Sequence, residues 1–176
     1  LKKLKMPCYK ISSGLANNIP LIEEIASLKK PTIISTGMLY EHEIKEIIKI
    51  FKRKKNNNIC LLKCTSLYPS PDKTINLNSI ATLKKKFPYP IGYSDHTLDD
   101  FAILSAVSLG ANIIEKHITL DKKAPNADHF LSIEPPELKI MVQKIRRIEN
   151  IMGNAAIIPV KQEIILRKER HRCIVA

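Results

Sequence analysis

The chain has 176 residues, which is enough for a domain with a hydrophobic core, and 44% of them are hydrophobic and 26% charged. No apolar run approaches the ~20 residues needed to span a bilayer, and no signal-peptide pattern opens the chain, so we expect a cytoplasmic protein without a membrane segment. The net charge of +12 raises the possibility of nucleic-acid binding. However, its lysine runs at 2–5, 52–55 and 84–86 are scattered and poor in aromatic residues, which favours solvated surface lysines and no nucleic-acid partner.

Short apolar runs alternate with amphipathic ones along the chain, a pattern typical of strand–helix units. The predicted strands are residues 8–12, 32–36, 59–64, 91–94 and 112–116. The predicted helices are residues 20–29, 42–55, 76–87, 99–109 and 136–152. Consecutive strands begin 24, 27, 32 and 21 residues apart, a spacing that suits parallel strands joined by helices.

Five strand–helix units in a row require a parallel sheet, which either a barrel or a doubly wound sheet supplies. No GxGxxG follows the first predicted strand, so nothing supports the dinucleotide-binding version of the doubly wound sheet. We therefore expect an α/β fold, a partial (β/α)8 barrel in residues 1–153 with three of its eight strands absent. Residues 154–176 change in character, because 159–172 are polar and basic, and are expected to form a linker and the first strand of a further unit.

The four cysteines predict no metal or redox site. Cys60 and Cys64 lie four positions apart on a predicted strand, so their side chains point to the same face, and the chain has no CxxC pair. Buried, reduced thiols are the favoured interpretation for all four, Cys8 and Cys173 included.

A histidine follows the carboxyl end of each of the last two predicted strands. Asp95 immediately precedes His96, and Glu115 lies two residues before His117. In a barrel both imidazoles would lie at the carboxyl ends of neighbouring parallel strands, about 4.8 Å apart, where they can share one metal ion. The acids would supply further ligands or fix the imidazole tautomer, and the Asp-His pair at 128–129 would complete the site. The alternative is that the histidines are structural.

Polar residues follow the other predicted strands as well, where barrel enzymes place their active sites. These groups are Lys10 with Ser12-Ser13-Gly14, Ser35-Thr36-Gly37, Thr65-Ser66 with Tyr68, and Ser94 to Thr97. Hydroxyls, backbone amides and a lysine that converge on one rim are typical of a phosphate site. Taken alone, Ser35-Thr36-Gly37 serves equally well as a helix cap, and Lys10 as a surface lysine.

In this order the same segments closely resemble the sialic acid synthase family, which includes the legionaminic and pseudaminic acid synthases. The matching segments are YKISSG (9–14), KPTIISTGM (30–38), CTSLYPSP (64–71), IGYSDHTL (91–98), GANIIEKHITLD (110–121) and DHFLSIEP (128–135). The closing RHRCIVA (170–176) resembles the family's junction into its antifreeze-like (SAF) C-terminal domain. The match covers nearly the whole chain, and its YSDHT and EKHxTLD blocks are highly specific.

The resemblance implies a (β/α)8 barrel followed by a small antifreeze-like domain, in a domain-swapped homodimer. Residues 1–153 would then hold strands four to eight of the barrel, and residues 154–176 the linker and the start of the SAF domain, so that the chain is truncated at both ends. Because three strands would be absent, the resemblance also implies that this chain alone is inactive.

The resemblance further implies a phosphoenolpyruvate-dependent transferase of carbohydrate and cell-surface polysaccharide biosynthesis. Such an enzyme forms a carbon–carbon bond between phosphoenolpyruvate and an N-acetylated amino-sugar aldehyde, N-acetylmannosamine or a 6-deoxy diamino analogue, and yields a nonulosonic acid and phosphate. The alternatives are an inactive or assembly-only barrel fragment and another phosphoenolpyruvate-condensing barrel of the aldolase type.

Site residues carried over from the family fall into three groups. His96 and His117 would ligate Mn²⁺ or Mg²⁺. Phosphoenolpyruvate would be held by Lys10, Ser13, Ser35, Ser66 and Ser94. The catalytic residues on the sugar side would be Tyr68, Glu115 and Asp128. The chain departs from the family at Leu15, where members usually carry an acid directly after the Ser-Gly.

Overall fold

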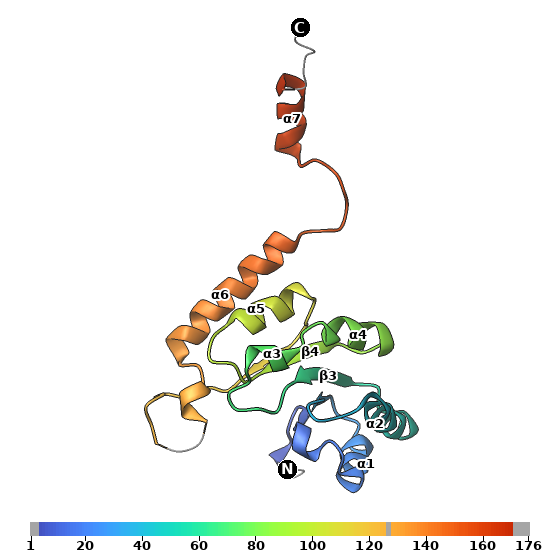
Figure 1. Cartoon of the computed structure of the whole chain (residues 1–176). Coiled ribbons are helices and arrows are strands. Elements are labelled where there is room, and N and C mark those ends of the chain that lie inside the picture. Colours follow the sequence, from blue (N-terminus) through green and yellow to red (C-terminus); the bar gives the residue numbers. More distant parts are fainter. Residues whose placement is uncertain (1–3, 126–127, 171–176) are drawn as a thin grey trace.

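The computed structural model describes residues 4–125 and 128–170, and it contains one five-stranded parallel sheet in the order β1-β2-β3-β4-β5 (Figure 1). The strands are β1 (Tyr9–Ile11), β2 (Thr32–Ser35), β3 (Ile59–Cys64), β4 (Ile91–Asp95) and β5 (Ile114–Lys116). Each strand pairs in parallel with the next one along the chain, as strands joined by short connections usually do. All five predicted strands are confirmed, with ends that differ by up to two residues.

Helices connect the strands, and all five predicted helices are present. They are α1 (Ile19–Ser27), α2 (Glu41–Arg53), α4 (Ser79–Lys86), α5 (Phe101–Ser108) and α6 (Pro135–Met152). The structure adds elements that were not predicted: α3 (Asp72–Ile75), α7 (Lys161–Arg170) and the 3-10 turns η2 (Ser13–Leu15) and η3 (His129–Leu131). These three-to-ten-residue elements are too short or too polar to show a clear apolar period.

The helix starts follow from local chemistry. The side chain of Asn18 accepts a hydrogen bond from the Leu21 amide at 3.2 Å and begins α1, where the prolyl nitrogen of Pro20 needs no acceptor. At the start of α2 the Tyr40 amide donates to the Glu43 carboxylate at 2.6 Å, which satisfies an amide that would otherwise have no partner.

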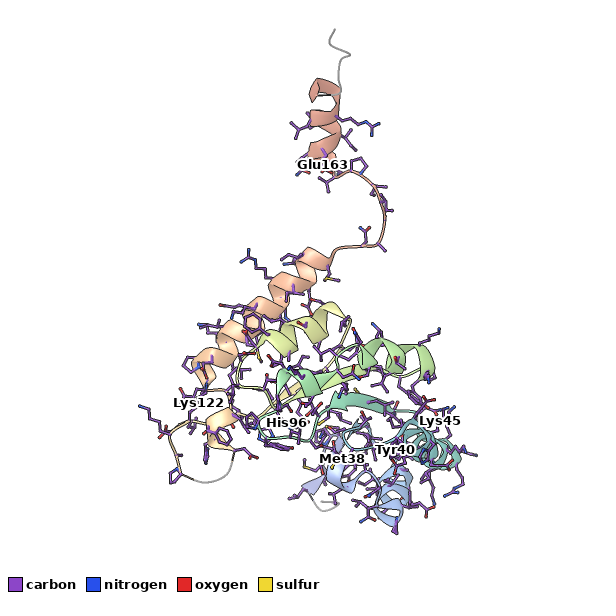
Figure 2. All side chains as sticks on the ribbon, in the orientation of Figure 1. Met38, Tyr40, Lys45, His96, Lys122 and Glu163 are labelled. Carbon is purple, nitrogen blue, oxygen red and sulfur yellow. The ribbon has the colours of Figure 1, made fainter. Side chains whose placement is uncertain are left out.

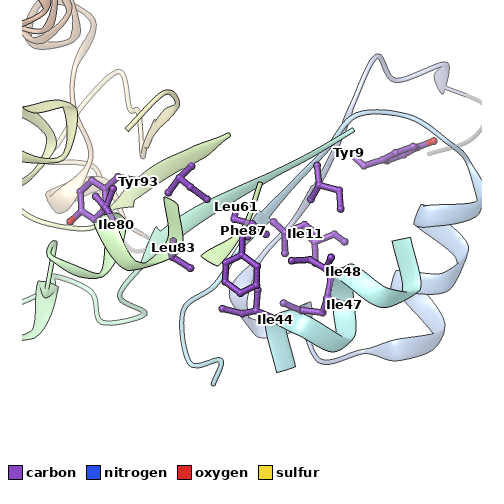
Figure 3. Packing of buried hydrophobic residues seen from close by; sticks show 14 of the residues in the cluster. Tyr9, Ile11, Ile44, Ile47, Ile48, Leu61, Ile80, Leu83, Phe87 and Tyr93 are labelled. Atoms are coloured by element: carbon purple, nitrogen blue, oxygen red, sulfur yellow. The ribbon is translucent and has the colours of Figure 1, made fainter. Parts of the chain in front are cut away.

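The outward face of the sheet is apolar and packs against the helices. Because side chains alternate along a strand, every second residue points to this face. The buried strand residues of the core are Tyr9, Ile11, Ile34, Ile59, Leu61, Ile91 and Tyr93. Figure 3 shows Ile11 and Leu61 beside Ile44 and Ile47 of α2, and Tyr93 beside Ile80 of α4. Burial of each such side chain contributes about 1.5–3 kcal/mol, so this face holds the unit together.

The inward face carries smaller and more polar residues. Lys10, Ser35 and Ser94 lie on it, together with the fully buried Leu62. Gly92 is required here, since a β-carbon at this position would lie 2.4 Å from the backbone carbonyl oxygen of Ile113 and 2.5 Å from a methyl group of Leu62. The inward face therefore leaves room at the carboxyl ends of the strands, while its middle is closed by aliphatic packing.

In the C-terminal segment, for which a linker and the first strand of a further unit are predicted, residues 161–170 form the helix α7. Figure 1 shows α7 standing apart from the sheet, beyond the end of α6. Large apolar side chains on and before α7 are exposed, among them Ile157, Ile158 and Ile165. The predicted strand at 173–176 lies outside the described residues, and the division at residue 153 stays a prediction. Within the described part of the chain, no helix combines the length and apolar character that crossing a membrane requires.

The buried thiol of Cys60 provides a test of the sheet. Burial raises the pKa of Cys60 to about 11, so roughly one thiol in a thousand is ionised at pH 8. We expect iodoacetamide at pH 8 to leave Cys60 unmodified in the folded chain and to alkylate it in denaturant, as followed by peptide mass spectrometry. The half-buried Cys8 serves as the internal control. Equal alkylation rates at Cys60 and Cys8 in the folded chain would contradict the buried position of β3.

Candidate active site

A cavity of about 540 Å³ opens at the carboxyl ends of the five strands. All but one of the predicted site residues line it: Lys10, Ser13, Ser35, Ser66, Tyr68, Ser94, His96, Glu115 and His117. The remaining residue, Asp128, has its carboxylate 3.5 Å from Nδ1 of His117. In the view of Figure 2, His96 lies at the end of the sheet between Met38 and Lys122. Parallel pairing therefore gathers the predicted residues at one rim.

The two predicted metal ligands lie side by side in the cavity. The ring centroids of His96 and His117 are 5.2 Å apart and the rings meet edge to face. Nδ1 of His96 lies 2.8 Å from the carbonyl oxygen of Thr65. A carbonyl oxygen only accepts, so Nδ1 carries the proton and Nε2 of the neutral ring keeps its lone pair. No sequence pattern reveals this contact, because its acceptor belongs to the backbone.

The ionisation of the two histidines differs. Burial lowers the pKa of His117, and repulsion from a charged His96 lowers it further. Burial also acts to lower the pKa of His96, but its hydrogen bonds to Cys64 and to the Thr65 carbonyl outweigh burial and raise that pKa. Repulsion between the two rings therefore opposes protonation of both at once.

This donor set fits a divalent ion that also takes ligands from outside the protein. No group of three or more histidine, cysteine, aspartate or glutamate side chains in residues 4–125 and 128–170 is placed to hold a metal ion. Two imidazole nitrogens would fill two positions of an octahedral ion such as Mn²⁺ or Mg²⁺, and water or substrate oxygens the others. His96 and His117 could therefore supply only part of such a ligand set.

The part of the cavity near β2 carries a buried hydroxyl without a partner. The hydroxyl of Ser35 is buried and has no hydrogen-bond partner among the described residues, although an orphaned buried hydroxyl costs about 1–3 kcal/mol. Beside it the Gly37 amide donates to Oγ of Ser13 at 3.0 Å. A β-carbon on Gly37 would lie 2.5 Å from Oγ of Ser66 and 2.7 Å from Oγ of Ser13, so only glycine admits both hydroxyls.

Lys10 and Glu115 join the two outer strands of the sheet across the cavity. Nζ of Lys10 lies 3.2 Å from Oε1 of Glu115, and Oγ of Ser94 donates to the same oxygen at 2.7 Å. Four strand spacings of about 4.8 Å separate β1 from β5, roughly 19 Å along the sheet. Two side chains span that distance only because the sheet curls, so this ion pair is direct evidence of barrel-like curvature.

Tyr68 covers the histidines from the loop after β3. Its ring centroid lies 4.0 Å from that of His96 and 5.7 Å from that of His117. Burial, together with the nearby Cys64, Asp128 and Glu115, raises the pKa of Tyr68. The phenol therefore stays protonated and remains a hydrogen-bond donor at neutral pH.

Three residues that were expected to support the cavity histidines have other partners. Asp95 does not flank the ring of His96, because it points to the opposite face of β4 and accepts from the Tyr93 hydroxyl at 2.9 Å. His129 does not line the cavity, since its Nδ1 lies 2.8 Å from the Thr119 hydroxyl. Glu115 is on the cavity side but engages Ser94 and Lys10 instead of an imidazole.

Residues 1–156 match the model of the NeuB family. The chain belongs to the NeuB family. It is 46% identical over all 176 residues to an uncharacterised protein of Methanocaldococcus jannaschii, of which it covers 52%. Over 156 residues, or 88% of its length, it is 44% identical to the N,N'-diacetyllegionaminic acid synthase of Campylobacter jejuni, of which it covers 47%. This NeuB chain thus spans about half the length of the curated relatives it matches.

Solved structures agree with the family assignment. The N-acetylneuraminic acid synthetase of Leptospira borgpetersenii, crystallised with citrate, superposes with a TM-score of 0.89 at 39% identity, covering 98% of this chain and 61% of that one. A truncated 3-deoxy-D-arabino-heptulosonate 7-phosphate synthase from Thermotoga maritima superposes at 0.73 with 19% identity, covering 84% of this chain and 60% of that one, which shows a common fold alone. The NeuB chain is therefore a partial α/β barrel, as the strand spacing predicts.

The unpartnered hydroxyl of Ser35 leads to a prediction in which stability and binding change in opposite directions. Ser35→Ala removes a buried polar group that has no partner, so thermal unfolding should stay unchanged or shift upward, by about 1 kcal/mol at most. Affinity for inorganic phosphate, measured by calorimetry, should fall about fivefold to tenfold, as expected for one lost hydrogen bond.

Ser70→Ala is the matched control for stability. The Ser70 hydroxyl is also buried but donates to the carbonyls of Leu67 at 2.9 Å and Thr65 at 3.2 Å, so this variant should be destabilised by about 1 kcal/mol. If Ser35→Ala were destabilised like Ser70→Ala and bound phosphate as before, the Ser35 hydroxyl would be structural.

Proposed function

We propose that this chain forms the phosphoenolpyruvate- and metal-binding part of a nonulosonic acid synthase. The observation that carries the proposal is the joining, in one cavity, of two adjacent imidazoles and a buried serine hydroxyl without a partner. Membership of the NeuB family, and relatives named as legionaminic acid synthase and N-acetylneuraminate-9-phosphate synthase, support this reaction class. The natural substrates would be phosphoenolpyruvate and an N-acetylated amino-sugar aldehyde.

The anion end of the cavity would hold phosphoenolpyruvate. Ser13, Ser35 and Ser66 would present hydroxyls to an oxygen-rich group. Lys10 would supply a cation, and Ser94, whose hydroxyl donates to Glu115 in the structure, would supply a further hydroxyl by turning to the ligand. Hydrogen bonds of this kind to charged oxygens are worth about 1.5–3 kcal/mol each. These groups would fix the phosphate and carboxylate, so that the enol carbon faces the histidines.

His96 and His117 would hold a divalent cation, Mn²⁺ or Mg²⁺, which when bound polarises the aldehyde carbonyl. Tyr68, Glu115 and Asp128 surround this end of the cavity and would bind the sugar hydroxyls. Because Ser94 and Lys10 both engage Oε1 of Glu115, we assign proton transfer to its Oε2.

The reaction balances with water as the third reactant. The C3 carbon of phosphoenolpyruvate forms a bond to the aldehyde carbon, whose oxygen takes up a proton and becomes a hydroxyl. Water adds to C2 and loses a proton, and the C2–oxygen bond breaks to release inorganic phosphate. The cationic Lys10 and the serine hydroxyls would stabilise the negative charge that leaves with phosphate.

Metal binding distinguishes the cavity histidines from the third histidine nearby. We expect His96→Ala and His117→Ala each to weaken Mn²⁺ binding at least tenfold in electron paramagnetic resonance titrations, because each removes one of two protein ligands. His129→Ala is the matched control and should bind Mn²⁺ as the unaltered chain does, since His129 bonds to Thr119 outside the cavity. Equal affinities in all three variants would make the cavity histidines structural.

Turnover tests the reaction itself. The full-length gene product should release phosphate from phosphoenolpyruvate only when N-acetylmannosamine or a 6-deoxy diamino analogue is present. Activity should disappear after dialysis against chelator and return with Mn²⁺. Unchanged turnover after exhaustive metal removal would overturn the metal assignment, and no turnover with any of these sugars would overturn the substrate class.

A further inference from the structure

At the carboxyl ends of β4 and β5, successive side chains point alternately to the two faces of the sheet. Ser94 pairs with Glu115 and Asp95 with Lys116 in the parallel register. The side chains of Ser94 and Glu115 meet in the cavity, and one step further along each strand the rings of the two histidines meet there too. Asp95 and Lys116 lie between these two pairs and point to the opposite face, since successive side chains of a strand alternate.

On that opposite face Asp95 and Lys116 form a buried ion pair. Nζ of Lys116 lies 2.6 Å from Oδ2 of Asp95, and the two side chains are only 6% and 0% exposed. Oδ1 of Asp95 also accepts from the Tyr93 hydroxyl at 2.9 Å and from the Thr97 amide at 3.2 Å. The Thr97 hydroxyl lies within 3.0 Å of both carboxylate oxygens, so Asp95 is surrounded by donors.

The same pair fixes the backbone just beyond the first histidine. Besides binding Asp95, Nζ of Lys116 donates to the carbonyl oxygen of Thr97, the residue after His96. Lys116 itself immediately precedes His117. One ammonium group therefore ties together the two chain segments that carry the two imidazoles.

Stability alone does not explain a buried ion pair at this place. Its desolvation offsets most of its attraction, and well-packed apolar residues are often as stable or more so. The pair can instead specify register. The strand β5 has only three residues, and within the described part of the chain it pairs with β4 alone. A slip by one residue would turn His117 away from the cavity and separate the two buried charges.

We propose that Asp95 and Lys116 are positioning residues, whose ion pair locks the β4–β5 register so that His96 and His117 face one divalent cation together. This inference rests on the proposed function in that it assumes such a cation. It assigns to both charged residues a role on the face away from the cavity, where they touch neither substrate nor metal.

The test compares metal affinity with stability in single and double variants. Asp95→Asn and Lys116→Met each leave an unpaired buried charge, whereas the double variant removes both charges. We expect Asp95→Asn/Lys116→Met to recover most of the thermal stability that either single variant loses, while its Kd for Mn²⁺ remains raised about tenfold or more. Recovery of wild-type Mn²⁺ affinity in the stable double variant would overturn the proposal.

Asp100→Asn is the matched control. Asp100 forms an ion pair with Lys144 at 2.7 Å and lines the same pocket as Lys116, but this pair is partly exposed and joins the start of α5 to α6 instead of joining β4 to β5. The Asp100→Asn variant makes the same carboxylate-to-amide change as Asp95→Asn. Its Kd for Mn²⁺ should stay within about twofold of that of the unaltered chain. A tenfold loss in Asp100→Asn would show that any charge change here weakens the metal site, and would also overturn the proposal.

A milder variant keeps the test decisive if the charge variants fail to fold. Thr97→Val removes the hydroxyl that contacts both Asp95 oxygens and leaves no charge unpaired. It should raise the Kd for Mn²⁺ about threefold to tenfold and speed amide hydrogen exchange in β5, and absence of both effects would count against the lock. If the unaltered chain bound no Mn²⁺, the proposed function would fail, and the exchange rates in β5 would still decide whether the ion pair sets the register.

Discussion

Parallel pairing of five consecutive strands is the constraint on which the rest of this structure depends. It places every carboxyl end at one rim, so residues that are 107 positions apart in sequence, Lys10 and His117, line one cavity. It also requires a helix between successive strands, and these helices bury one face of the sheet. The opposite face carries polar side chains at the ends of the strands, and the buried Ser35 hydroxyl and the histidine pair both lie there.

Much of this arrangement was predictable because its signals are periodic. Strand positions follow from short apolar runs at regular spacing, and the rim residues follow from the ends of those strands. The position of Ser35 at the rim and the neighbouring imidazoles follow in this way, whereas the anion that Ser35 would bind stays a prediction. The short helix α3 and the polar helix α7 were not, since neither carries enough apolar residues to show a helical period.

Other parts of the site depend on geometry that a sequence does not display. Proximity in sequence suggested that Asp95 supports His96, but alternation along the strand sends them to opposite faces. The contact that does orient His96 comes from the backbone oxygen of Thr65, thirty-one residues away, and any residue type could supply it. Gly37 was recognised as part of a polar group, yet its reason, the closeness of two serine hydroxyls, required coordinates.

The ion pair between Lys10 and Glu115 forms only when the sheet is curled, so ligand binding at the rim and the curvature of the sheet are coupled. These charges come from opposite edges of the sheet, so flattening it would separate them and widen the cavity in the same motion. A ligand that bridges the rim therefore favours the curled form by a free energy that grows as RT ln(1 + [L]/Kd). Ligand concentration and the radius of this half-barrel are thermodynamically linked.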